Sequence, residues 1–292
     1  MSDIRMNRRR FLGATAGGAA ALATSGALAS SAAAVPRGHI SIQMWSVRDM
    51  FAADPEGTLR ALYGIGYRWI ELAGIPPGHT ASSLRSLLDE VGIRAYSAHN
   101  GWDPNNFDEG AYRAQLEDAV TLGQAQSGFP WFGGPYTEDF FKVLAGQLNQ
   151  AATIAQEYGL EFFYHNHDFE FVNRRADGRP LYTVLLEETD PKRVRFQMDF
   201  MWINFGGGPW RQLLTTMRER FLSFHVKDQS PQASPTCNCD LFTDPGLGVT
   251  PLEEMIALAG TKGNKRFIVE RDSQEHPLTT ARIGYQFLLG VS

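Results

Sequence analysis

Cysteine is almost absent from this 292-residue sequence, which contains only Cys237 and Cys239. So few thiols exclude a small domain framed by disulfides, and two cysteines separated by one residue form a strained bridge at best. A zinc site would need more thiols or histidines than the surrounding loop provides. We therefore interpret both cysteines as incidental and expect the fold to depend on a packed hydrophobic core.

Long basic blocks are absent beyond residue 10, and 27 Lys and Arg residues are outnumbered by 32 Asp and Glu residues, which gives a net charge of −5. Proteins that bind nucleic acid or anionic membranes carry basic patches or stripes. The composition therefore argues against both partners and favours a small molecule. Whether the chain forms a homo-oligomer is left open.

Charged side chains are missing from residues 13–34, which are mainly Ala, Gly and Ser. The preceding segment is Asn7-Arg8-Arg9-Arg10-Phe11-Leu12, and a twin arginine before a weakly apolar stretch is typical of a twin-arginine export signal. We predict a signal peptide over residues 1–34 and one domain over residues 35–292. The alternative is an N-terminal membrane anchor, for which the segment is too weakly hydrophobic.

Twin-arginine export carries proteins across the membrane already folded. We therefore expect a periplasmic or secreted protein with no stable membrane partner once the signal is removed. This route also accommodates a cofactor or metal installed before export.

A Gly-rich phosphate loop is missing as well, because the position after the first expected strand reads Gln43-Met44-Trp45-Ser46. This argues against an open dinucleotide-binding sheet. Short apolar runs instead alternate with amphipathic stretches through eight strand–helix units, which predicts an α/β fold, the (β/α)8 TIM barrel. The expected strands are 40–47, 69–73, 94–98, a poorly marked one near 128–132, 161–164, 195–198, 222–226 and 266–269, and the expected helices are 55–62, 82–91, 108–122, 138–158, 181–188, 209–218, 251–259 and 278–289.

Polar side chains follow most of these strands. The densest group lies in residues 160–171, LEFFYHNHDFEF, where an apolar run ends in two histidines and two carboxylates. Any one such residue is also consistent with an ordinary hydrogen-bonded strand end, but residues after the strands of a TIM barrel meet on one face, so their number favours a pocket. The other polar residues expected there are Glu71, His99, Asp199, His225, Lys227 and Glu270.

A metal site is the chemistry that this group of residues suggests. Asp199, His225 and Glu270 offer a carboxylate, an imidazole and a second carboxylate. This donor set suits one divalent metal ion, Mn²⁺, Co²⁺, Zn²⁺ or Mg²⁺, with positions left open for substrate oxygens.

These motifs resemble those of the xylose isomerase-like TIM barrels, the sugar phosphate isomerase/epimerase superfamily that includes inosose dehydratase. The resemblance rests on residues 43–48 (QMWSVR), 70–72 (IEL), 164–171 (YHNHDFEF), 198–199 (MD), 225–228 (HVKD), 246–248 (GLG) and 269–270 (VE). It implies a cation held by Glu, Asp, His and Glu after the fifth to eighth strands, hence Asp199, His225 and Glu270. Because His165 stands where many members have the first Glu, we predict Glu170 as the fourth ligand and leave a histidine as the alternative.

The resemblance implies proton abstraction from a carbon next to a carbonyl that the metal polarises. The candidates for proton transfer are Glu170, Glu270, His165 and His167, and Lys227 is expected to stabilise the oxyanion. The expected substrate-binding residues are Glu71, His99, Trp45, Trp102 and Trp202. For each tryptophan, core packing is an equally good interpretation.

Four functions are compatible with the sequence. A sugar isomerase or epimerase acting through an enediolate is the first, and export favours a sugar without phosphate. An exported lyase or dehydratase that eliminates from 3-keto-glycosides is the second, because such enzymes resemble this chain. A non-catalytic sugar-binding protein and a glycoside hydrolase that pairs Glu71 with Glu270 are the others.

Overall fold

The computed structural model describes residues 34–233, 241–273 and 275–290. Almost all of the predicted signal peptide, and both Cys237 and Cys239, lie outside the described residues. The predictions for these segments therefore stay predictions.

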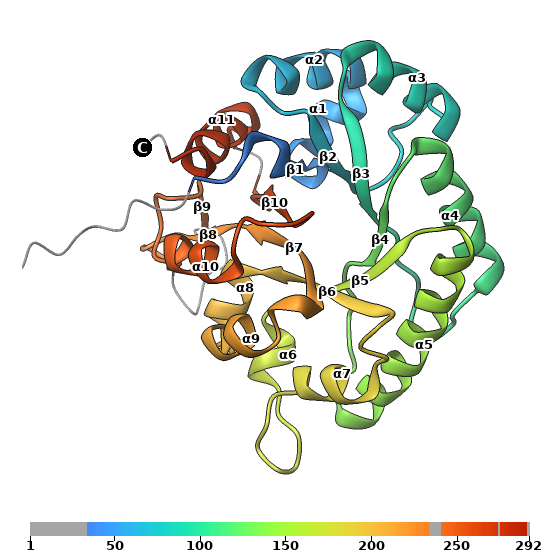
Figure 1. Cartoon of the computed structure of the whole chain (residues 1–292), viewed down its shortest axis with the longest axis vertical. Helices are drawn as coiled ribbons and strands as arrows, with labels where there is room; N and C mark the ends of the chain where they lie inside the picture. Colours follow the sequence, from blue (N-terminus) through green and yellow to red (C-terminus); the bar gives the residue numbers. More distant parts are fainter. Residues whose placement is uncertain (1–33, 234–240, 274, 291–292) are drawn as a thin grey trace, which may run out of the picture. The chain divides into compact units, whose positions relative to one another are not determined.

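Eight parallel strands form a closed barrel, as predicted (Figure 1). The strands are β1 (Ile40–Gln43), β2 (Trp69–Leu72), β3 (Arg94–His99), β4 (Gln126–Phe129), β5 (Glu161–His165), β6 (Val194–Asp199), β7 (Phe221–Val226) and β10 (Arg266–Val269). Strand β1 closes the barrel, because its Ile42 pairs with Ile70 on one side and with Val269 on the other. The carboxyl ends of all eight strands consequently meet at one face.

Each predicted helix is found, with ends that differ by a few residues. The crossover helices around the barrel are α2 (Pro55–Ile65), α3 (Ala81–Val91), α4 (Glu109–Leu122), α5 (Glu138–Glu157), α7 (Tyr182–Glu188), α9 (Trp210–Thr216), α10 (Leu252–Ala259) and α11 (Pro277–Leu288). Helix α3 shows why the ends are legible in the sequence: Thr80 and Ser83 form a capping box at its start, and Gly92 ends it in the left-handed conformation at φ 85°. None of the described helices is long and apolar enough to span a membrane.

Short elements that were not predicted sit directly after several strands. They are η2 (Met44–Val47), α1 (Arg48–Ala53), α6 (Phe169–Val172), α8 (Phe200–Phe205) and the antiparallel pair β8 (Asp228–Gln229) and β9 (Phe242–Thr243); η1 (Arg37–His39) and η3 (Arg218–Arg220) precede strands. The strand expected over 40–47 therefore ends early, at Gln43. The Gln43 side chain accepts a hydrogen bond from the Trp45 amide at 3.1 Å and so starts the turn.

The fourth strand covers Gln126–Phe129, earlier in the chain than the expected 128–132. Pro130 follows at once, and because it has no amide hydrogen it cannot continue the ladder. Gly128 is needed within the strand, since a Cβ at that position would overlap the ring of Phe163 on β5. The Gly and Pro that made this strand hard to recognise are thus part of how it packs.

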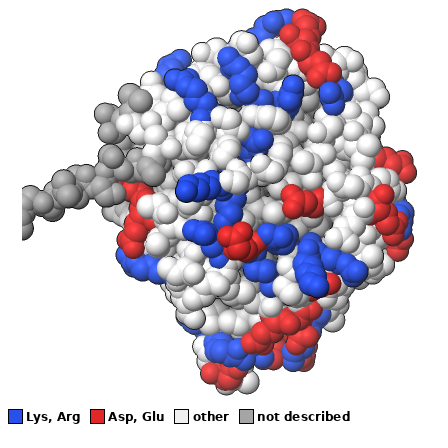
Figure 2. Space-filling view, viewed as in Figure 1, with Lys and Arg blue, Asp and Glu red and all other residues white. Residues whose placement is uncertain are grey.

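The surface in Figure 2 carries Lys and Arg side chains interspersed with Asp and Glu side chains. Many of these are paired on the outer helices, as in Arg211 with Glu254 at 2.6 Å. Exposed pairs of this kind contribute little to stability. The core that holds the barrel is instead built from buried aliphatic and aromatic side chains.

Candidate functional site

A cavity of about 340 Å³ lies at the carboxyl ends of the barrel strands. Its lining contains five of the polar residues expected there, His99, His165, His167, Lys227 and Glu270. The lining residues are Trp45, Ala73, His99, Pro130, Trp131, His165, His167, Lys227, Glu270 and Asp272. A concave site where several titratable groups converge at this end of a TIM barrel is the usual location of catalysis.

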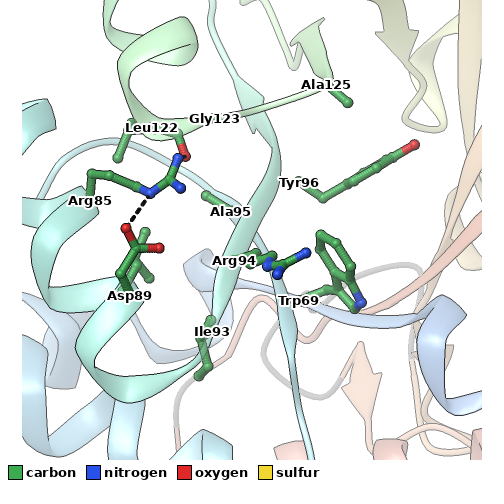
Figure 3. Close-up of a pocket in the computed structure, with 11 residues that line it drawn as sticks. Trp69, Arg85, Asp89, Ile93, Arg94, Ala95, Tyr96, Leu122, Gly123 and Ala125 are labelled. Carbon is green, nitrogen blue, oxygen red and sulfur yellow. Dashed lines mark hydrogen bonds and ion pairs between the residues drawn. The ribbon is translucent and has the colours of Figure 1, made fainter.

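A second cavity, of about 310 Å³, lies near the starts of β2 and β3 (Figure 3). Its charged groups already have partners within the protein. Arg85 donates to Asp89 at 2.8 Å, and Arg94 lies beside the ring of Trp69. It has neither histidines nor several carboxylates that converge on open space. We therefore place the candidate site at the opposite end of the barrel.

Glu71 is fully buried beneath the cavity. Its carboxylate accepts hydrogen bonds from the Gln43 amide at 2.8 Å, the Ser97 hydroxyl at 2.6 Å and the Gln197 amide at 2.8 Å. Burial alone would raise the pKa of Glu71, but the charges of His99 and His225 outweigh it and hold the pKa well below its ordinary value. Glu71 is thus an ionised carboxylate, and the surrounding side chains are oriented by donating hydrogen bonds to it.

His225 lies between two carboxylates. Its Nε2 is 2.6 Å from Glu71 Oε1, and its Nδ1 is 2.6 Å from Glu270 Oε2. Burial by itself would lower the pKa of His225, yet Glu270 and Glu71 raise it to about 10. The imidazole therefore carries a positive charge here, which a divalent cation next to Glu270 would replace.

The predicted ligands Asp199, His225 and Glu270 are brought together, with one donor atom of each within 4.8 Å of the others. Asp199 Oδ1 caps α8 by accepting from the Trp202 amide at 2.8 Å, whereas its buried Oδ2 accepts no hydrogen bond. Burial raises the pKa of Asp199 to about 6. A buried carboxylate oxygen that accepts no hydrogen bond and has the Lys227 ammonium 3.3 Å away, beside a histidine and a second carboxylate, fits a divalent cation.

Lys227 provides a further positive charge beside these carboxylates. Its Nζ is 3.3 Å from Asp199 Oδ2 and 3.0 Å from Glu270 Oε2, and it donates to Asp272 at 2.9 Å. Burial would lower the pKa of Lys227, but the surrounding carboxylates raise it above its ordinary value. The ammonium group is therefore held charged at the edge of the cavity.

Gln197 determines which ring nitrogen carries a proton in His99 and in His165. Its amide nitrogen donates to Glu71 at 2.8 Å and to the Ser223 hydroxyl at 2.9 Å. The amide oxygen must then be the group that accepts from His99 Nε2 at 2.9 Å and from His165 Nδ1 at 2.8 Å. The proton of His165 consequently sits on Nδ1.

The other ring nitrogen of His165, Nε2, is therefore unprotonated and has a free lone pair. It lies 3.9 Å from Asp199 Oδ2. Burial, reinforced by the charge on His225, holds the pKa of His165 well below its ordinary value. A neutral imidazole pointing at the metal-capable carboxylate is what a ligand requires. His165 thus faces Asp199, although the group of possible ligand atoms that contains it is formed with His99 and His225.

Potential ligands form two groups among the described residues, one of Asp199, His225 and Glu270 and one of His99, His165 and His225, and Glu170 is in neither. Its carboxylate accepts from the Tyr164 hydroxyl at 2.7 Å and from the His167 amide at 3.0 Å. Burial raises the pKa of Glu170 to about 8. The structure therefore does not group Glu170 with the other expected ligands; its carboxyl group supports the backbone of His167, and its role in proton transfer stays a prediction.

The other expected residues divide between the cavity and its surroundings. His99, His167 and Trp45 line the cavity. Trp202 packs beside it, with its ring centre 5.6 Å from that of His167. Trp102 does not reach it, because the indole packs in an aromatic cluster 4.4 Å from Phe129. Glu71 does not reach it either, so the expected substrate contacts of Glu71 and Trp102 are corrected.

Several residues of the site were not predicted: Gln43, Ser97, Trp131, Gln197, Ser223 and Asp272. A signal existed for two of them. Gln197 stands two residues before Asp199 and so faces the same side of β6, and Asp272 stands two residues after Glu270. Trp131 was missed because the fourth strand was placed too late in the chain.

A family model for the xylose isomerase-like TIM barrel matches residues 59–290. The chain therefore belongs to this family, and its curated members similar to the chain are enzymes. It is 27% identical over 168 residues to an inosose dehydratase of Halalkalibacterium halodurans, covering 52% of this chain and 54% of that protein. It is 27% identical over 205 residues to an inosose dehydratase of Geobacillus thermodenitrificans, covering 65% and 66%. The matches thus span only half to two thirds of these relatives.

Solved structures with the same fold include isomerases and epimerases. A sugar phosphate isomerase/epimerase from Parabacteroides distasonis superposes with a TM-score of 0.70 at 20% identity, covering 87% of this chain and 94% of the other. The IOLI protein with a bound zinc atom gives a TM-score of 0.64 at 14% identity, covering 86% and 98%. A 3-keto-D-glucoside 4-epimerase from E. coli gives a TM-score of 0.61 at 18% identity, covering 86% of this chain and 98% of the other. At these identities the likeness establishes the fold alone.

Proposed function

We propose that this protein is a divalent-metal-dependent sugar isomerase or epimerase that removes a proton from the carbon next to a carbonyl group. The observation that carries the proposal is the cluster of Asp199, His225 and Glu270, in which Asp199 Oδ2 is buried without a hydrogen bond and Glu270 lines the cavity. These residues, with His165, would hold the metal. A bound divalent cation would polarise the carbonyl and acidify the neighbouring C–H bond.

His167 is our candidate for the group that accepts the proton. It lines the cavity, and burial together with the charge of Lys227 holds its pKa well below the ordinary value, so the imidazole is neutral. Its Nδ1 has no hydrogen-bond partner. Because this nitrogen is buried, the neutral imidazole would accept the proton at an atom that faces the cavity.

Lys227 is our candidate for stabilising the negative charge that develops on the oxygen. Its ammonium group faces the cavity and is held charged by the carboxylates around it. A fixed charge of this kind is worth more in a site that excludes water.

The lining of the cavity supports a sugar without phosphate. Lys227 is the one Lys or Arg among the lining residues, and it already faces Asp199, Glu270 and Asp272. A phosphate dianion would meet two carboxylates there and no unpaired cation. An uncharged sugar can instead bind through hydroxyl groups.

Elimination, as in a dehydratase or a 3-keto-glycoside lyase, is the second candidate, and the similarity to two inosose dehydratases favours it. It begins with the same proton removal. If the next carbon carries a hydroxyl or glycosidic oxygen, that C–O bond breaks, the oxygen leaves with the bonding electrons and takes up a proton, and a C=C bond forms. The metal site and His167 would serve both reactions.

The test combines metal analysis with deuterium exchange. Protein loaded with Mn²⁺, Co²⁺ or Zn²⁺ is expected to bind about one ion per chain and to exchange a C–H next to the carbonyl of a ketose or 3-keto-glycoside in heavy water. Chelation should stop the exchange, and product analysis separates an isomer from an eliminated sugar. His167→Asn should lower exchange by about 10²-fold or more with the metal retained. Exchange that continues in metal-free protein, or none with any sugar, would refute the proposal.

Export through the twin-arginine route is part of the same proposal. It rests on Arg8, Arg9 and the uncharged stretch that follows. Replacing both arginines by lysines should leave the protein in the cytoplasm in a cell-fractionation experiment. Unchanged export would contradict this assignment.

A further inference from the structure

Two exposed tryptophans lie at one site. Of the six tryptophans, all within the described residues, only Trp45 and Trp131 are exposed, at 45% and 56%, and both line the cavity that contains His165, Lys227 and Glu270. An exposed indole leaves a large apolar area in water, so two of them at one cavity indicate a ligand that covers them. Sugar rings have apolar C–H faces that stack on indoles.

Trp45 is held rigidly beside the reacting groups. The guanidinium of Arg48 lies 4.2 Å from the centre of its ring, and the same guanidinium donates to the Trp45 carbonyl at 2.7 Å and to the Asp272 carbonyl at 3.0 Å. Trp45 lies in η2, directly after β1, and β1 pairs with β10, which Glu270 directly follows. The indole therefore lines the cavity on the same side as Glu270.

Trp131 stands on another side of the cavity. It follows β4, which is separated from β1 by β2 and β3 in the barrel order. Strands three positions apart in an eight-stranded barrel are roughly 13 Å apart, from a strand spacing of about 4.8 Å and the usual tilt. The two indoles therefore come from different parts of the barrel end, on elements that follow strands three positions apart.

The backbone around Trp131 is anchored although its ring is exposed. Pro130 lines the cavity next to it, and Phe132 is buried against Phe169, with ring centres 5.1 Å apart. The cavity wall on this side includes the uncharged residues Trp131, Pro130 and Ala73, with His99 at the end of β3 between them in the barrel order. It contrasts with the side formed by Lys227, Glu270 and Asp272.

From this arrangement we propose that the cavity has two ring-binding subsites and that the substrate is a glycoside. Its reacting keto-sugar ring lies on Trp45 beside the metal ligands, and its second, uncharged ring stacks on Trp131. The assignment of the reacting ring rests on the proposed function. The second subsite rests on Trp131 and its apolar wall alone.

The test compares 3-keto-glucosides that carry a methyl or a phenyl aglycone. Wild type should have a higher kcat/KM for the phenyl than for the methyl compound by about 5- to 10-fold, and Trp131→Ala should abolish this preference by lowering kcat/KM for the phenyl compound more than for the methyl compound. Tyr63→Ala is the matched control, because Tyr63 is an aromatic residue with 40% exposure and a stacked arginine, Arg68, but does not line the cavity. It should retain the preference.

Two results would overturn the subsite: equal kcat/KM for both compounds in wild type, or a loss in Trp131→Ala that is the same for both. If wild type turns over no sugar at all, the proposed function fails, and the subsite is then judged by calorimetric binding of phenyl and methyl glucosides. Tighter binding of the phenyl compound that disappears in Trp131→Ala supports it. Equal binding of the two compounds rejects it.

Discussion

Glu71 and His225 are joined by a hydrogen bond of 2.6 Å between Oε1 and Nε2, although 154 residues separate them in the sequence. Both side chains are fully buried. A histidine that ligates a metal through one nitrogen commonly donates its other N–H to a carboxylate, which sets its tautomer and orientation. Glu71 is placed to do this for His225.

Glu71→Gln should therefore lower metal affinity without removing a ligand. The amide cannot serve as an anionic partner for the imidazole, and a loss of this kind typically weakens binding about 10- to 100-fold. Calorimetric titration of chelator-treated protein with Mn²⁺ or Zn²⁺ measures it. Glu117→Gln, at an exposed position on α4, is the control and should bind as wild type does. Unchanged affinity in Glu71→Gln would remove Glu71 from the site.

A second pair of variants distinguishes the two candidates for the fourth ligand. His165→Gln should weaken metal binding strongly, because the lone pair that faces Asp199 is lost. Glu170→Gln should leave metal binding close to that of wild type, since its amide oxygen can still accept from the Tyr164 hydroxyl and the His167 amide. The visible spectrum of the Co²⁺-loaded proteins reports the ligand set directly. A spectrum altered by Glu170→Gln and not by His165→Gln would reverse the assignment.

The sequence was sufficient to predict the barrel because the signals that mark its strands and helices lie within short segments of the chain. Apolar runs closed by polar residues, and helices stopped by glycines such as Gly92, are visible without any knowledge of contacts. Once eight units are counted, the topology of the barrel places the strand ends together. This is why Asp199, His225 and Glu270 could be grouped before their distances were known.

The remainder of the site depends on side-chain direction, which sequence spacing does not give. Glu170 is close in sequence to the expected ligand position, but the short helix α6 turns it towards Tyr164. Gln197 was overlooked because an amide has no charge to attract attention, although it holds four hydrogen bonds. Hydrogen-bonded amides of this kind become recognisable only when their partners are located.

Gln197→Leu tests the role of this amide. Removing it leaves Glu71, Ser223 and two histidines short of buried partners, so we expect a loss of about 1–3 kcal/mol in the free energy of unfolding together with weaker metal binding. Urea unfolding and calorimetry measure the two effects. Gln126→Leu is the matched control: Gln126 is also buried, but its side chain makes one hydrogen bond, to Glu161 at 3.2 Å. It should change stability without changing metal affinity.

The pH dependence of stability should reveal the buried carboxyl group of Glu170. Its pKa is raised by burial from 4.5 to about 8. Between these values the folded protein keeps a proton that the unfolded chain releases, so this group makes stability fall as pH rises from about 4.5 to about 8, by at most about 1.4 kcal/mol per pH unit. Glu170→Gln should abolish this part of the slope and be more stable than wild type above pH 8.

Urea unfolding of metal-free protein at several pH values measures this difference. Glu253→Gln, at an exposed position on α10, should keep the slope of wild type. Parallel pH profiles for wild type and Glu170→Gln would show that the carboxyl group does not hold its proton in the folded state.

Two glycine substitutions should have opposite effects on stability. At Gly128 an added methyl group would overlap the Phe163 ring within the barrel, so Gly128→Ala should lower the free energy of unfolding by about 1–3 kcal/mol. At Gly146, on the exposed side of α5, a Cβ meets no atom within 4 Å, and Gly146→Ala should raise stability by about 0.5–1 kcal/mol through reduced chain entropy. Thermal unfolding of both variants measures the contrast. If Gly128→Ala proved neutral, Phe163 would have room to move, and the glycine would not be required by the packing of β4 against β5.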